Sequence, residues 1–343
     1  MDDLPGRLDV LEHQVRILEL RSTRDLHRLR WWRRLAGTLA VLTVFSLPLS
    51  LVAGPEERRG DDRKGSGAHP QKPKEDHEQT VRDLLRRFLA MEQKLKSVTS
   101  GINGAGLPEL VITGANLRIV NGLGTTDTVN GVGNLIVGYN EPRADGATMQ
   151  TGSHNIVGGQ FNNFSSFGGL VVGSSNEISG AVAAVSGGSS HIASGNFSSI
   201  SGGVGNRAEG EGSAVSAGQG NRATGIFASI SGGEANIASG EGSSISGGLF
   251  NTASNHVASI SGGIQNFAIG DGSSVSGGFG GRATGDLSSI SGGFGNMATG
   301  TASSVSGGEA NTASGDESSV TGGHNRVAPG DFDWVAGGLF QDQ

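Results

Sequence analysis

The chain has 343 residues, a formal net charge of −7 and no cysteine; 61 residues are glycine and only 5% are aromatic. Disulfide bonds and cysteine catalysis are therefore excluded, and the composition differs from that of an ordinary globular protein. Only six of the 25 basic residues follow position 100, whereas 17 of the 32 acidic residues do. The second part of the chain thus lacks the basic surface that nucleic-acid binding requires, and we expect no nucleic-acid partner.

Residues 1–34 have a pattern typical of a short coiled coil. Their apolar residues alternate at spacings of four and three, which places them on one face of a helix. These residues are Leu4, Leu8, Leu11, Val15 and Leu18.

Residues 35–53 form a continuous apolar run. As a helix this run would be on the order of 30 Å long, enough to cross a bilayer. Arg33 and Arg34 precede it, next to Trp32, which predicts that the N-terminus stays in the cytoplasm. A signal peptide ending at Ala53 is the alternative, but the segment ahead of the run is too long for its n-region. We expect a single-pass membrane protein whose C-terminal part is extracytoplasmic.

Two segments separate this run from the remainder. Residues 54–76 are rich in Gly, Pro and charged residues, so we expect a flexible linker. In residues 77–100 the spacing of four and three returns, which predicts a helical coiled-coil stalk. Its apolar residues are Val81, Leu84, Phe88, Met91, Leu95 and Val98.

A repeat of constant length fills residues 170–343, with the same residue types returning every 15 positions. One column is apolar: Leu170, Val185, Ile200, Val215, Ile230, Ile245, Ile260, Val275, Ile290, Val305, Val320 and Val335. A second column holds Asn206, Asn221, Asn236, Asn251, Asn266, Asn296 and Asn311. A third holds Ala193, Ala208, Ala223, Ala238, Ala253, Ala268, Ala283, Ala298, Ala313 and Ala328, and glycine closes most repeats.

Each repeat contains too few large apolar residues for an amphipathic helix. The stretch Ser-Ser-Ile-Ser predicts a short strand with the isoleucine on one face and serines on the other. The Gly-Gly that follows predicts a corner, and Asn-x-Ala predicts a second strand with both residues on one face. We therefore expect an all-β parallel solenoid, or β-roll, with 15-residue coils about 4.8 Å apart. Residues 101–169 are more apolar, and we interpret them as transition coils.

The unit Ser-Ile-Ser-Gly-Gly-x-x-Asn-x-Ala-x-Gly resembles the head repeats of trimeric autotransporter adhesins over roughly residues 130–338. Ser229, Ile230, Gly233, Ala238 and Gly240 match the family's positions in one repeat. The resemblance implies a trimer of parallel β-rolls on a coiled-coil stalk. The period departs from the family's usual 14 residues, and no barrel-length strands follow the repeats, so self-transport is not implied. The layout also resembles uncharacterised bacterial membrane proteins.

The thin core independently favours association. Burying one Ile or Val contributes about 1.5 to 3 kcal/mol, whereas ordering one coil costs on the order of 20 kcal/mol. Three chains side by side would bury the apolar and alanine columns from a second direction. We therefore expect a homotrimer.

No pattern in the sequence indicates catalysis, a cofactor or a metal. The histidines of the repeat region lie in four different contexts, without a serine or acid arranged around them; they are His154, His191, His256 and His324. Calcium-binding solenoids need an aspartate in each coil. Here the aspartates near corners are scattered: Asp271, Asp286, Asp316 and Asp331. We interpret the asparagine column as a structural ladder of stacked amides.

These features predict a membrane-anchored surface or envelope fibre that binds cells, matrix proteins or glycans by adhesin-like multivalent contact. One alternative is a passive spacer rod. Another is an ice-binding solenoid that uses its Ser-x-Ser rows. Positions outside the columns vary between coils, and an exposed Phe250 or Phe279 would make an adhesive edge or cap a corner.

Overall fold

The computed structural model of the chain describes residues 74–336. The coiled coil predicted for residues 1–34, the membrane span predicted for 35–53 and most of the linker predicted for 54–76 lie outside the described residues. Within the described range, no helix is long and apolar enough to cross a membrane.

Helix α3 (Lys74–Lys94) occupies most of the predicted stalk. The prediction placed its end near residue 100, but the helix ends at Lys94 and Val98 begins strand β1 (Val98–Ile102). Strand β1 pairs antiparallel with β2 (Pro108–Ile112). The β-branched Val98 and Thr99, followed by glycine, favour a strand over a further helical turn. The pairing of α3 with other helices in a coiled coil stays a prediction.

The β1–β2 hairpin also changes the interpretation of residues 101–169 as transition coils. Its antiparallel pairing cannot belong to a solenoid whose successive strands run parallel. The parallel solenoid starts at β3 (Leu135–Val137), which pairs with β4 (Ile156–Gln160). Only the later part of the predicted transition therefore forms coils.

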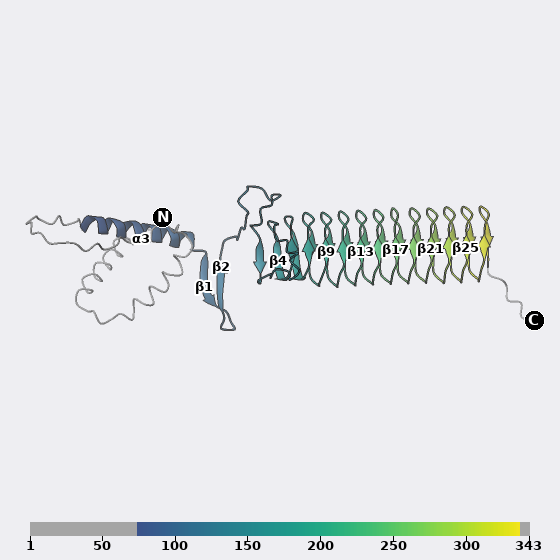
Figure 1. Cartoon of the computed structure of the whole chain (residues 1–343), viewed down its shortest axis with the longest axis horizontal. Coiled ribbons are helices and arrows are strands. Elements are labelled where there is room, and N and C mark those ends of the chain that lie inside the picture. Colours follow the sequence, from purple (N-terminus) through teal and green to yellow (C-terminus); the bar gives the residue numbers. More distant parts are fainter. Residues whose placement is uncertain (1–73, 337–343) are drawn as a thin grey trace, which may run out of the picture. The chain divides into compact units, whose positions relative to one another are not determined.

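The repeat region is an all-β parallel solenoid, as predicted (Figure 1). Its first sheet has 14 strands. In spatial order these are β3, β4, β6 (Leu170–Ser174), β8 (Ala184–Val185), β10 (Ser199–Ile200), β12 (Ala214–Val215), β14 (Ser229–Ile230), β16 (Ser244–Ile245), β18 (Ser259–Ile260), β20 (Ser274–Val275), β22 (Ser289–Ile290), β24 (Ser304–Val305), β26 (Ser319–Val320) and β28 (Trp334–Val335).

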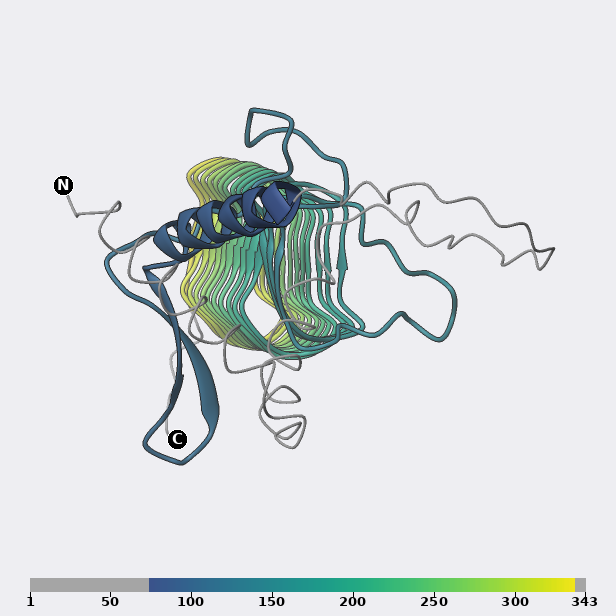
Figure 2. The same ribbon diagram turned by 90° about the vertical axis from the view of Figure 1, so that its left-hand side faces the viewer.

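The second sheet has 12 strands and supplies the opposite wall of each coil. Its members are β5 (Asn163–Phe164), β7 (Glu177–Ile178), β9 (Ile192–Ala193), β11 (Arg207–Ala208), β13 (Arg222–Ala223), β15 (Ile237–Ala238), β17 (Thr252–Ala253), β19 (Phe267–Ala268), β21 (Arg282–Ala283), β23 (Met297–Ala298), β25 (Thr312–Ala313) and β27 (Val327–Ala328). Viewed along the solenoid, the coils superimpose, so side chains at equivalent positions form continuous rows (Figure 2).

The register corrects one member of the apolar column. Val185 pairs with Val171, not with Leu170, and Val171 is fully buried while Leu170 is only partly so. The two coils from Val157 to Val185 have 14 residues each, since Val157 pairs with Val171. Their first corner has one residue fewer than the Gly187–Gly188 corner of the next coil. Because strand residues alternate between faces, this deletion turns Val171 inward.

The core is a single file of inward-facing columns. In each regular coil the anchor residue of the first sheet packs opposite the alanine of the second, as with Ile200 and Ala208, which are 1% and 0% exposed. At the N-terminal end of the solenoid, Phe164 and Ile178 replace the alanine. These larger side chains fill the wider space of the 14-residue coils. Ile200, Ile230, Ile245, Ile260 and Ile290 are all buried, as are Ala208 and Ala238.

Candidate interaction surfaces

The asparagine column lines the inside of the first corner. Asn206 donates from Nδ2 to the carbonyl oxygens of Gly202 and Gly218, each at 3.0 Å. Its Oδ1 accepts the backbone N–H of Asn221 at 2.9 Å. The arrangement differs from a stack of amides, because the bonds run mainly from side chain to backbone. Equivalent bonds hold Asn221, Asn236, Asn251, Asn266, Asn296 and Asn311, all fully buried.

His191 occupies the asparagine column near its start and is fully buried. The backbone N–H of Asn206 donates to its Nδ1 at 3.0 Å, so Nδ1 carries no proton and the ring imitates the amide acceptor. Burial lowers the pKa of His191, although contacts with the backbone of Gly203 and Asn206 oppose this shift. The residue therefore acts in the interior as a neutral ladder member.

A column of buried serines was missed from the sequence. The serine two residues before each anchor faces inward beside it, whereas the sequence interpretation placed all serines on the outer face. Strand alternation was the available signal, since positions two apart share a face. The hydroxyl oxygens of these serines have no hydrogen-bond partner within the described residues. This buried serine column comprises Ser198, Ser213, Ser243, Ser273, Ser288, Ser303 and Ser318, with Ala183, Ala228 and Ala258 at equivalent positions.

The outer face of the first sheet is flat and uncharged. The residues on either side of each anchor point outward, as Ser229 and Ser231 do around Ile230, and both are exposed. From Ala184 to Thr321 every such position is serine, alanine or threonine. This serine face offers hydroxyl groups but no charge and no large apolar side chain.

An apolar row lies on the corner between the two sheets. Each coil contributes one residue there, and these residues are joined by parallel β-bridges from coil to coil. Ile264 and Phe279 are 41% and 40% exposed, and Phe294 is 54% exposed. The rings of Phe279 and Phe294 stack at 5.2 Å between centroids. We call Leu249, Ile264, Phe279 and Phe294 the bridge row.

Acidic residues bound the bridge row on both sides. Glu234 precedes Leu249 in the same series of bridges, and Glu309 follows Phe294. Phe250 extends the apolar surface beside Leu249 and is 49% exposed. A contiguous apolar strip with a polar rim is the form that interaction sites take on soluble proteins.

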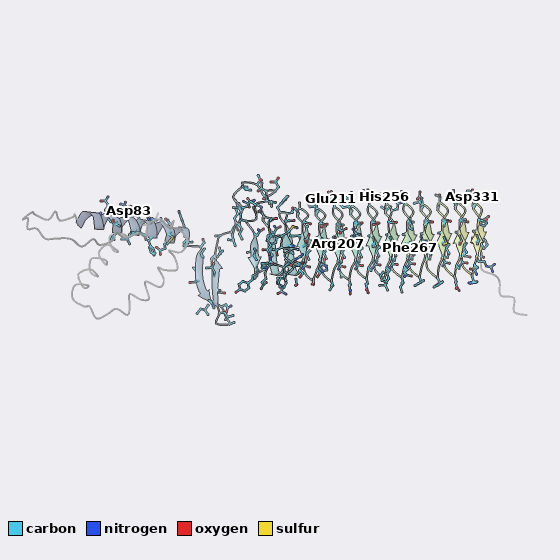
Figure 3. All side chains as sticks on the ribbon, viewed as in Figure 1. Asp83, Arg207, Glu211, His256, Phe267 and Asp331 are labelled. Atoms are coloured by element: carbon cyan, nitrogen blue, oxygen red, sulfur yellow. The ribbon has the colours of Figure 1, made fainter. Side chains whose placement is uncertain are left out.

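The outer face of the second sheet carries its own charged cluster. Arg207 and Arg222 both bind the carboxylate of Glu209, at 2.6 and 2.8 Å. Burial raises the pKa of Glu209, but the two guanidinium groups outweigh it and hold the pKa below its usual value. Arg282 lies 4.8 Å above the ring of Phe267. Figure 3 shows Arg207 and Phe267 on this face. The arginines are thus engaged by neighbouring coils.

A pocket of about 500 Å³ lies beside Arg143. The Nε of Arg143 donates to the carbonyl oxygen of Phe161 at 2.9 Å, and its Nη2 donates to those of Ser175 and Asn176. Nη1 lies 3.8 Å from the carboxylate of Glu177. Because the guanidinium is bonded on all sides, it ties a loop to the first coils and leaves no free charge for a ligand.

The remaining histidines do not converge on a reactive group. The Nε2 of His154 accepts the backbone N–H of Asn121 at 3.1 Å. His256 Nδ1 lies 3.1 Å from Asp271, and His324 lies 3.9 Å from Glu309. In residues 74–336 no three metal-ligating side chains gather into a site for an ion.

Neither a search of protein-family models nor a search of curated proteins found a match for this chain. The function must therefore be argued from the surfaces themselves.

Proposed function

We propose that this protein is a membrane-anchored, non-enzymatic surface or envelope fibre that binds cells, matrix proteins or glycans in an adhesin-like manner. Residues 35–53 would be its anchor, and the solenoid would be extracytoplasmic and homotrimeric. The observation that carries the proposal is the bridge row, four apolar side chains in consecutive coils, exposed on an otherwise polar scaffold.

The contrast between interior and surface supports a binding role. Inside, the same residues return in almost every coil because they make the same contacts. On the bridge corner, residues range from Gln219 and Glu234 to Phe279. The corner therefore tolerates polar residues, and folding alone does not require an apolar strip at Leu249 to Phe294. Exposed apolar side chains lower solubility unless a partner covers them.

The geometry suits weak contacts that add together. Consecutive coils place bridge-row side chains about 4.8 Å apart, so the four residues span roughly 15 Å. If three chains present one such row each, simultaneous engagement raises the apparent affinity without any new contact. A passive spacer rod would not need the row, and this difference separates the two functions.

The experiment displays the full chain on cells and measures their retention on plates coated with matrix proteins or glycans. The variant Ile264→Gln/Phe279→Gln removes the centre of the row with a residue that the same corner already carries at Gln219. Val204→Gln is the matched control, because Val204 is an isolated apolar residue in the same series. We expect retention to fall several-fold for the double variant only. Equal retention for all three proteins, or none above cells lacking the chain, would favour the spacer.

A further inference from the structure

A second exposed edge lies at the other corner, between the second sheet of one coil and the first sheet of the next. The residue three positions before each anchor forms a row there, which we call the corner row. Its backbone N–H groups bind the preceding coil, as when Phe227 N–H donates to the carbonyl oxygen of Glu211 at 2.8 Å. The spacing of the corner row is thus fixed by the solenoid.

Large apolar residues occupy the corner row in alternate coils. Phe197, Phe227, Val257 and Leu287 are 61%, 65%, 50% and 67% exposed. Each has a positive φ, between 45° and 58°. That conformation is unfavourable for bulky and β-branched side chains, and glycine would adopt it without strain. Neither burial nor backbone preference therefore accounts for these four residues.

Glycine does occupy the intervening coils, at Gly212, Gly242 and Gly272. A Cβ atom on Gly212 would lie 2.6 Å from the ring of Phe227, and one on Gly272 would lie 2.9 Å from Leu287. Each bulky side chain thus leans over the glycine of the preceding coil. This packing explains why the glycines alternate with large residues, but it does not explain why large residues are present.

Carboxylates accompany the glycines. The residue before each of these glycines is Glu211, Glu241 or Asp271. None of the three pairs with a lysine or an arginine among the described residues; Asp271 lies beside His256. Glu211, His256 and Asp331 are labelled along this edge in Figure 3. The edge therefore alternates an acidic coil with an apolar coil, and each period covers two coils, or roughly 10 Å.

We propose that the corner row from Phe197 to Leu287 is a docking edge for a basic amphipathic helix of a partner protein. In a helix, residues seven apart lie on one face about 10.5 Å apart, close to the two-coil period. Apolar residues at that spacing meet Phe197, Phe227, Val257 and Leu287. Lysines or arginines between them meet Glu211, Glu241 and Asp271.

Charge decides between this partner and other occupants. An anionic membrane surface or nucleic acid is repelled by three carboxylates in alternate coils. An extended strand with apolar residues three apart turns them to opposite faces, so it presents only every second one to the edge. A basic helix meets both the apolar and the acidic positions from one side. This edge is separate from the bridge row, and its test does not depend on the adhesin-like function.

The test measures binding of a synthetic helical peptide to the full chain, captured on a sensor in one fixed mild detergent. The probe has leucine at every seventh position and its neighbours in the helix, with lysine elsewhere, over three heptads. The first variant, Phe227→Gly/Leu287→Gly, installs the residue that alternate coils already use at this positive φ, so the fold is retained. The second variant, Glu211→Gln/Glu241→Gln, removes two charges. Ile264→Gln, on the bridge row, is the control.

We expect each double variant to weaken binding by about tenfold or more, equivalent to about 1.4 kcal/mol, and Ile264→Gln to leave it unchanged. Binding should also weaken from low to high salt in the wild type, and less so in the Glu→Gln variant. Equal binding by wild type and Phe227→Gly/Leu287→Gly would overturn the proposal. Equal binding of a peptide with glutamate in place of every lysine would overturn it as well, because the edge would then not recognise positive charge.

Discussion

The buried serine column leads to a prediction that runs against the usual effect of core substitutions. Seven serines place hydroxyl groups in the interior without a hydrogen-bond partner among the described residues. A buried polar group without a partner costs roughly 1 to 3 kcal/mol. Alanine occupies the same position at Ala183, Ala228 and Ala258, fully buried, so the coil accepts a methyl group there. Replacing these serines by alanine should therefore stabilise the solenoid.

The perturbation is the triple variant Ser213→Ala, Ser243→Ala and Ser273→Ala. These serines lie two coils apart, roughly 10 Å, and share no partner, so their effects should add. Taking about 1 kcal/mol per site, the low end of the cost of an unpaired hydroxyl, gives a gain of about 3 kcal/mol. Removing three small oxygen atoms leaves little empty volume to offset this gain.

The assay is hydrogen exchange of the full chain, resolved by coil. A repeat protein need not unfold in one step, and exchange reports the stability of each segment. We expect slower exchange in the coils around Ser213 to Ser273. Ser201→Ala is the control, because this serine lies on the exposed serine face and its replacement should change stability by less than about 0.5 kcal/mol. Faster exchange in the triple variant would refute the reasoning, since it would mean that the hydroxyls make stabilising bonds.

Three further predictions concern the other columns. Because the pKa of His191 is lowered in the fold, the unfolded chain takes up a proton first as the pH falls through about 6.5, so the stability of this coil should decrease from neutral to acidic pH; in hydrogen exchange, His191→Asn should show a smaller decrease than wild type, and an identical pH dependence would contradict the assignment. Asn236→Leu/Asn251→Leu removes bonds to the backbone of neighbouring coils and should lower stability by about 2 to 4 kcal/mol in thermal melting followed by circular dichroism; an unchanged melting temperature would exclude a ladder role. Gly225→Ala would drive its Cβ into the carbonyl oxygen of Gly240, whereas the same change at Gly232 meets open space, so the first should cost on the order of 3 kcal/mol and the second almost nothing in the same melts; equal melting temperatures would mean that the coils can separate at this corner.

Much of the solenoid could be predicted because its columns repeat with a fixed residue chemistry. Strand alternation and Gly-Gly corners were enough to place Ile230, Asn236 and Ala238 on the inner face. The prediction was wrong at Leu170, because the 15-residue spacing was extended backwards into coils of 14 residues. Val171 lies one position later, and only the pairing between coils, set by the shorter corner, shows that it is the buried residue. A single deletion is invisible to a column count.

The surfaces were harder to predict, because a one-letter period does not say which residues of neighbouring coils touch. Phe279 was singled out as a possible edge residue, but its stacking on Phe294 depends on the coil spacing. Phe227 and Gly212 looked like unrelated variable positions until the fold placed one over the other. The two-coil alternation of the corner row is therefore a property of packing between coils.

This coupling also limits how the two edges can change. Each coil contacts only the coils next to it, so a substitution on the bridge row has no direct contact with the corner row across the interior. Along one edge, however, a change must suit the next coil: a bulky residue at position 212 would collide with Phe227, whereas Gly295 beside Phe294 leaves space around the ring. The solenoid can therefore alter one edge in steps of two coils while the other edge and the core stay constant. That independence is what allows one repeating scaffold to carry two surfaces of different chemistry.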